Sequence, residues 1–101
     1  MNEFSEEMRG LEISDVTFHA AGEEDVGRGL IGWISCRVNR ALALEGLTLR
    51  RTAAGRCAIA FPARTDRAGR RHFFIRPLSD AVRRDLEHQI LEHLGAGKES
   101  R

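Results

Sequence analysis

The sequence has no apolar run approaching the roughly 20 residues that a membrane-spanning helix needs, so it does not predict a membrane protein. The first ten residues, MNEFSEEMRG, are acidic and lack the apolar segment of a signal peptide, and the expected location is therefore cytoplasmic. Cysteine is also scarce. Cys36 and Cys57 lie in apolar-rich runs and match no metal-binding or redox spacing, so both are expected to be reduced thiols of the core.

Lysine is nearly absent, and 15 of the 16 basic residues are arginine. The net charge of +1 hides an uneven distribution, with −5 over residues 1–49, +8 over residues 50–84 and −2 over residues 85–101. A composition rich in arginine, alanine and glycine is typical of a GC-biased genome, which explains arginine in place of lysine. It does not explain why ten arginines fall in one third of the chain.

The length and composition predict one globular domain. A chain of 101 residues, 42% hydrophobic and 31% charged, is too short to divide into two halves that each bury a core. Residues 1–10 and 96–101 show no periodic pattern and are expected to be mobile tails. The domain itself is expected over residues 11–95.

Alternating apolar and polar residues predict five antiparallel strands. They cover residues 11–18, 30–39, 41–52, 57–61 and 71–75. The apolar phase changes before Val16 in the first of these strands, which predicts a bulge or twist there. The phase also breaks at Glu45-Gly46 in the third strand. Residues 19–29 are expected to be a polar, glycine-bearing loop.

The last predicted element is a helix over residues 80–94. Ser79 is a good N-cap and Gly95 a natural C-terminal stop. One apolar stripe recurs every four residues, at Val82, Leu86, Ile90 and Leu94. The fold class is therefore α+β, an antiparallel sheet with one C-terminal helix. Because one helix covers only one face of a sheet, Ile31, Trp33 and Phe74 on the other face predict a homodimer.

Patterns that could carry chemistry are incomplete. GRGLIG (27–32) matches a dinucleotide fingerprint, but that motif needs a strand before it and a helix after it, and here a β-patterned run follows. His88 and His93 are five residues apart, which is not the spacing of two metal ligands on one helix face. No serine or cysteine has a nucleophile motif. We expect no cofactor, no metal, no catalytic residue and no enzymatic activity.

The stretch ARTDRAGRRHFFIRP (63–77) combines five arginines with one acid, Asp66. Arginines beside aromatic residues suit contacts with phosphates and bases, and they speed association with a polyanion. The alternative is a solvated hairpin whose arginines pair with the acids of residues 23–25. The alternation places Phe73 and Ile75 toward the core. It places His72, Phe74 and Arg76 outward.

Several short motifs follow one another over residues 11–95. They are LEISDV, GLIGWISCRV, LEGLTLRR, IAFPAR after Gly55, a turn with Gly69, FFIRPLS, and the helix VRRDLEHQILEHL. In this order and spacing they resemble the stage V sporulation protein G (SpoVG) septation-regulator family. The most specific parts are FPAR (61–64) and IRPLS (75–79). Phe61 and Ala63 stand where the family often has methionine and serine.

The resemblance implies a small antiparallel sheet with a C-terminal helix, a homodimer and a non-enzymatic cytoplasmic regulator that binds nucleic acid. It links that regulator to septation in cell division and to sporulation and other developmental gene control. DNA is the expected partner, and RNA or an acidic partner protein are the alternatives. The resemblance and the cluster around the turn give these candidate contact residues: Arg64, Arg67, Arg70, Arg71, Arg76, Arg83 and Arg84.

Overall fold

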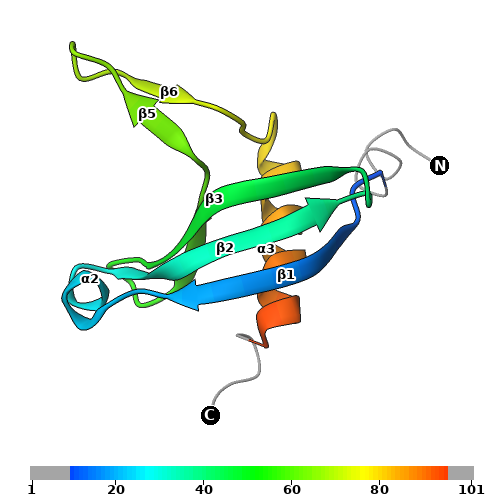
Figure 1. The fold of residues 1–101 in the computed structure, drawn as a ribbon, viewed down its shortest axis with the longest axis horizontal. Coiled ribbons are helices and arrows are strands. Elements are labelled where there is room, and N and C mark those ends of the chain that lie inside the picture. The colour runs from blue at the N-terminus through cyan, green and yellow to red at the C-terminus, as the bar shows by residue number, and fades with distance from the viewer. Residues whose placement is uncertain (1–9, 96–101) are drawn as a thin grey trace. The chain divides into compact units, whose positions relative to one another are not determined.

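The computed structural model describes residues 10–95, and Figure 1 shows the helices and strands that they form. The tails expected at residues 1–10 and 96–101 lie outside this range, apart from Gly10. A four-stranded antiparallel sheet has the order β1-β2-β3-β4, and β5 and β6 form a separate two-stranded antiparallel sheet. The strands are β1 (Ile13–Ala20), β2 (Leu30–Val38), β3 (Leu42–Arg51), β4 (Cys57–Ala60), β5 (Ala63–Thr65) and β6 (Arg71–Phe73). The helices are α2 (Glu23–Gly27) and α3 (Asp80–Leu94).

The predicted α+β class, with an antiparallel sheet and one long C-terminal helix, is confirmed. Two details differ from the sequence pattern. The segment expected as a loop at residues 19–29 contains the five-residue helix α2. The strand expected at residues 71–75 is shorter, and it pairs with β5 instead of joining the main sheet.

The described residues form two compact units. One contains residues 10–17, 35–44 and 77–95, and the other contains residues 18–34 and 45–76. The first unit holds the long helix and the turn between β2 and β3. The second holds α2, most of β3, and the β5–β6 hairpin, so the arginine-rich stretch is part of the second unit.

Helix α3 begins and ends where its capping residues predict. Ser79 Oγ accepts a hydrogen bond from Val82 N at 3.2 Å, and Gly95 closes the helix with a left-handed φ of 74°. Its buried side chains are Val82, Leu86 and Ile90, three of the four residues of the expected stripe, whereas Leu94 is only partly buried. Within residues 10–95, neither helix combines the length and the apolarity needed to cross a membrane.

A glutamine side chain of α3 fastens the helix to the start of β1. Gln89 Oε1 accepts from Ile13 N at 3.0 Å, and Gln89 Nε2 donates to Leu11 O at 3.1 Å. The same Nε2 donates to Asp85 Oδ2 at 2.9 Å, one helical turn earlier. The carboxamide of Gln89 therefore forms hydrogen bonds with one N–H and one C=O of the extended backbone, as the backbone of a neighbouring strand would do.

Both strands in which the apolar phase changes contain a residue with a left-handed backbone. Asp15 in β1 has a φ of 49° and Gly46 in β3 a φ of 83°. Each residue bends its strand at the place where the apolar phase changes, so that Leu44 and Leu47 are both buried despite an odd spacing. Aspartate and glycine are residue types that tolerate this left-handed conformation.

The two cysteines differ in burial. Cys36 is buried in β2, and burial raises the pKa of its thiol. Cys57 is partly exposed at the start of β4. Both are free thiols, so the expected core position is confirmed for Cys36 and holds only in part for Cys57.

The turn between β2 and β3 contains an arginine in a conformation that suits glycine. Asn39 and Arg40 have φ of 55° and 54°, and Ala41 N donates to Val38 O at 3.0 Å. Two successive left-handed residues define the two-residue hairpin turn that asparagine-glycine forms best. We expect Arg40→Gly to raise the free energy of unfolding by roughly 0.5 kcal/mol, because the Cβ strain exceeds the entropy that glycine gains in the unfolded chain. Urea unfolding measures the change.

Arg40→Ala is the control. Both substitutions remove the ion pair of Arg40 Nη2 with Glu12 Oε2, which is 3.6 Å long and joins two exposed side chains. Only glycine removes the Cβ atom. If Arg40→Gly and Arg40→Ala raise the free energy of unfolding equally, the gain does not come from relief of backbone strain at residue 40.

Candidate nucleic-acid interface

The β5–β6 hairpin sorts the arginine-rich stretch into two faces. The paired residues are Ala63 with Phe73, Arg64 with His72, and Thr65 with Arg71. Because opposite residues of an antiparallel pair share a face, Arg64 and His72 lie on one side of the hairpin. Arg71 lies on the other side with Phe73, and its guanidinium carbon is 5.5 Å from the centre of that ring.

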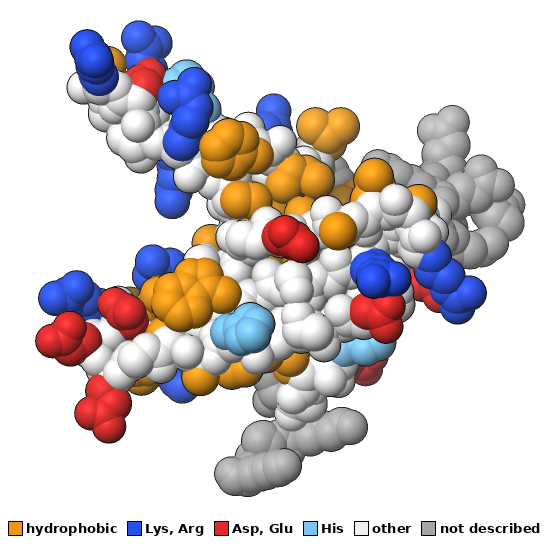
Figure 2. Space-filling view, viewed as in Figure 1, with side chains coloured by type: hydrophobic (Ala, Val, Ile, Leu, Met, Phe, Trp, Pro, Cys, Tyr) orange, Lys and Arg blue, Asp and Glu red, His pale blue; other side chains and the backbone are white. Residues whose placement is uncertain are grey.

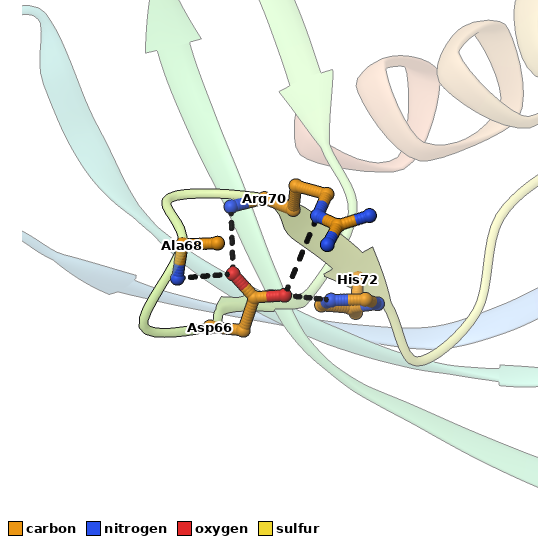
Figure 3. A network of polar contacts seen from close by, with 4 residues as sticks. All are labelled: Asp66, Ala68, Arg70 and His72. Atoms are coloured by element: carbon orange, nitrogen blue, oxygen red, sulfur yellow. Dashed lines mark hydrogen bonds and ion pairs between the residues drawn. The ribbon is translucent and has the colours of Figure 1, made fainter.

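One carboxylate organises the turn between these strands (Figure 3). Asp66 Oδ1 accepts hydrogen bonds from Ala68 N at 2.9 Å and from Arg70 N at 2.8 Å. The backbone adds two more bonds, from Asp66 N to Arg70 O and from Gly69 N to Asp66 O. Gly69 takes a φ of 85°, which allows the chain to reverse.

The second carboxylate oxygen is directed to side chains. Asp66 Oδ2 lies 2.7 Å from His72 Nε2 and 4.0 Å from Arg70 Nε. The hydrogen bond from His72 lowers the pKa of Asp66 most, and the backbone N–H of Arg70 lowers it further. The carboxylate is therefore ionised at neutral pH and can only accept, so His72 donates through a protonated Nε2.

The arginines of the hairpin are exposed and largely unpaired. Five of them share residues 63–76 with one acid, which gives this stretch a formal net charge of +4. Within the described part of the chain, Arg64, Arg67 and Arg76 form no ion pair, and Arg70 meets only Asp66 at 4.0 Å. Figure 2 shows blue side chains gathered over the β5–β6 hairpin, with red and pale blue among them.

The expected alternative, pairing of these arginines with the acids of residues 23–25, is wrong for residues 10–95. Glu23, Glu24 and Asp25 lie in the first turn of α2, and none of the ion pairs between described residues joins them to an arginine. The carboxylates favour the N-terminal end of their own short helix, where they meet its positive dipole. The positive charge of the hairpin is left facing solvent.

An apolar run follows directly on this basic surface. Phe73, Phe74 and Ile75 are exposed by 45%, 69% and 44%. The expectation that Phe73 and Ile75 face the core is therefore wrong, whereas Phe74 and Arg76 do face outward. Phe73 is exposed because all three residues of β6 are exposed, so neither face of this strand is covered. Ile75 lies beyond the end of regular pairing at Phe73, where the strand alternation no longer applies. Aromatic groups next to unpaired arginines can stack on bases or pack against a partner.

Two of the candidate residues lie in the other unit. Arg83 and Arg84 are in the first turns of α3, which belongs to the first compact unit. Arg83 Nη1 donates to Glu87 Oε2 at 3.2 Å, so its charge is already paired along the helix. Arg84 is exposed. The structure thus brings together Arg64, Arg67, Arg70 and Arg71, with Arg76 following in the same unit.

The sequence pattern did not give Asp66 and His72 a role in this surface. A signal for Asp66 was present, because aspartate at the first position of a turn and glycine at the fourth is the pattern of a type I turn. Asp66 and Gly69 are placed in this way. The partnership with His72 has no such signal, since it depends on the pairing register of β5 and β6.

The glycine motif at residues 27–32 does not have the architecture of a dinucleotide site. Gly27 ends the short helix α2 and Leu30 begins β2, so the helix precedes the strand. That order is the reverse of what places a helix N-terminus at a pyrophosphate. Gly29 instead precedes β2 and Gly32 lies within it, so the β-patterned run expected after the motif is a strand.

No known protein-family model matches the sequence, and the search of curated proteins finds no significant match.

Proposed function

We propose that this chain is a non-enzymatic, SpoVG-like regulator that binds DNA through the β5–β6 hairpin. The observation that carries the proposal is a set of exposed hairpin arginines that form no ion pair with another residue of the range 10–95: Arg64, Arg67, Arg71 and Arg76. A planar guanidinium suits the bidentate binding of phosphate, and its desolvation cost is lower than that of an ammonium group. The septation and developmental roles of that family, and a cytoplasmic location, rest on the short sequence motifs.

The geometry favours contacts with the backbone of the nucleic acid over reading of base edges. Two strands of three residues with arginines on both faces can reach phosphates on either side of the hairpin. Such binding is driven by counterion release and is therefore strongly salt-dependent. The hairpin has neither a recognition helix nor a set of asparagine and glutamine side chains to select bases.

A salt series with duplex DNA tests the proposal. If the hairpin of one chain contacts about four phosphates, log K should fall with log salt at a slope of about −3.6. Fluorescence anisotropy between low and physiological salt measures this slope, and the mass of the protein in solution should be measured alongside it. An affinity that is the same at all salt concentrations, or no binding at low salt, would exclude this mode of DNA binding.

Single-stranded RNA is the second candidate ligand, and the exposure of Phe74 favours it. A ring that is 69% exposed beside arginines can stack on an unpaired base, which a duplex interior does not offer. Competition between duplex DNA and single-stranded RNA of equal length separates the two.

A pull-down in the presence of nuclease tests the remaining alternative, an acidic partner protein.

We further propose that the regulator is a homodimer. Among residues 10–95, eight large apolar side chains are exposed, including Phe18 and Trp33 on the strands of the main sheet. Burial of such groups against a second copy would remove them from water and would present two arginine hairpins in one assembly. Two hairpins would also double the number of phosphate contacts and so steepen the salt dependence.

A further inference from the structure

Asp66 places a negative charge within the arginine-rich hairpin. It is the single acid of residues 63–76 and lies inside the proposed phosphate-binding hairpin, where its negative charge opposes the binding of a polyanion. A surface selected for positive charge alone would have a neutral residue at this place. The contacts of the carboxylate therefore have to contribute something that offsets its charge.

The contacts show what that contribution is. Asp66 Oδ1 holds the N–H groups of Ala68 and Arg70 at 2.9 and 2.8 Å, so it binds the chain on both sides of Gly69. Asp66 Oδ2 holds His72 at 2.7 Å, which ties the turn to β6. Arg67 and Arg70 belong to the turn of residues 66–70 that these bonds close. The Asp66 side chain is only 27% exposed, because these neighbours surround it.

We propose that Asp66 is a positioning residue of the hairpin, which holds the turn in the shape that presents its arginines to phosphates. The inference rests on the proposed function for the identity of the ligand, and on the hydrogen bonds for the mechanism. Without the side-chain bonds only the two backbone bonds, Asp66 N to Arg70 O and Gly69 N to Asp66 O, would close the turn. The turn would then be more mobile, and the ordering of its side chains would oppose binding. Asp66 acts through the backbone and through His72, and does not itself touch the ligand.

Two substitutions at this position separate charge from geometry. Asp66→Asn removes the negative charge but retains an Oδ1 that can accept from both backbone N–H groups, and its amide can donate to the other tautomer of His72. Asp66→Ala removes the same charge and every one of these bonds. Each variant raises the charge of the hairpin by one, so Coulomb attraction alone predicts equally tighter binding for both.

The expected result is that the two variants move in opposite directions. Asp66→Ala should bind duplex DNA about three- to tenfold more weakly than the wild type despite its extra positive charge, with a shallower salt slope. Asp66→Asn should bind at least as tightly as the wild type. Equal changes in the two variants, in either direction, or no change in Asp66→Ala would overturn the proposal. Thermal unfolding of each variant verifies that the fold is retained.

A second measurement reads the turn without any ligand. Backbone ¹⁵N order parameters at Ala68 and Arg70 should be near 0.8 in the wild type and in Asp66→Asn, and below about 0.6 in Asp66→Ala. A rigid turn in Asp66→Ala would overturn the positioning role whatever the protein binds. Failure of the wild-type protein to bind DNA would instead overturn the proposed function, so the two failures can be told apart.

Discussion

Replacing Arg64, Arg67 and Arg76 together with alanine is expected to lower the affinity for duplex DNA by roughly 10- to 100-fold at low salt. These three side chains are exposed and form no ion pair with a described residue, so their removal leaves the internal bonds of the hairpin in place. If each contacts one phosphate, the slope of log K against log salt should become shallower by about 2.7. Anisotropy over a salt series gives both quantities.

A second triple variant of equal charge shows whether the position of the arginines matters. Arg50, Arg51 and Arg56 are also exposed, and they belong to β3 and to the turn after it. Their replacement by alanine changes the net charge by the same three units but leaves the hairpin intact. We expect this variant to lose less than about threefold in affinity, because its three arginines lie outside the hairpin that is proposed to contact the phosphates. Equal losses in both triple variants would mean that DNA responds to the overall charge and not to the hairpin.

Replacing Gly32 with alanine is expected to lower the free energy of unfolding by about 2–3 kcal/mol. Gly32 is buried in β2, and a Cβ atom built on it would overlap the carbonyl oxygen of His19 and the ring of Phe18. The carbonyl belongs to the backbone of β1 and cannot move without disturbing the pairing of β1 with β2. Chemical denaturation measures the loss.

Gly27→Ala is the matched control for this substitution. Gly27 lies in the same compact unit, has no atom within 4 Å of a built Cβ, and is the last residue of α2. Its replacement should change the free energy of unfolding by less than about 0.5 kcal/mol. If Gly32→Ala lowers the free energy of unfolding no more than Gly27→Ala does, then β1 and Phe18 accommodate the added Cβ atom without strain. In the background Phe18→Leu, the cost at Gly32 should be smaller, since one of the two obstacles is reduced.

The elements that the sequence predicted well are those with local signals. Helix α3 has its cap at Ser79, its stop at Gly95 and its apolar stripe all within 17 residues, so no distant contact was needed to find it. The sequence does not predict the two-residue turn at Asn39-Arg40, because arginine is not a residue type that favours the left-handed conformation. The division of the strands into two sheets could not be predicted either, because the alternation of apolar and polar residues identifies a strand but not the strand with which it pairs.

The candidate site was predictable in composition and not in geometry. The concentration of arginines in residues 63–76 is a property of the sequence itself, and it is sufficient to predict a basic surface there. The outward placement of Phe73 was not predictable, because burial depends on whether another layer covers that face. The contact of Asp66 with His72 likewise required the register that pairs Arg64 with His72.

The amide of Gln89 has a consequence for how copies of this protein can associate. Strand β1 is at the edge of the main sheet, where a free row of N–H and C=O groups would accept a strand from another chain. At the start of that edge, Leu11 O and Ile13 N are already bound by Gln89. An incoming strand would have to displace this amide before it could extend the sheet there. Edge-to-edge growth into larger aggregates is therefore opposed at the N-terminal end of β1 by one side chain.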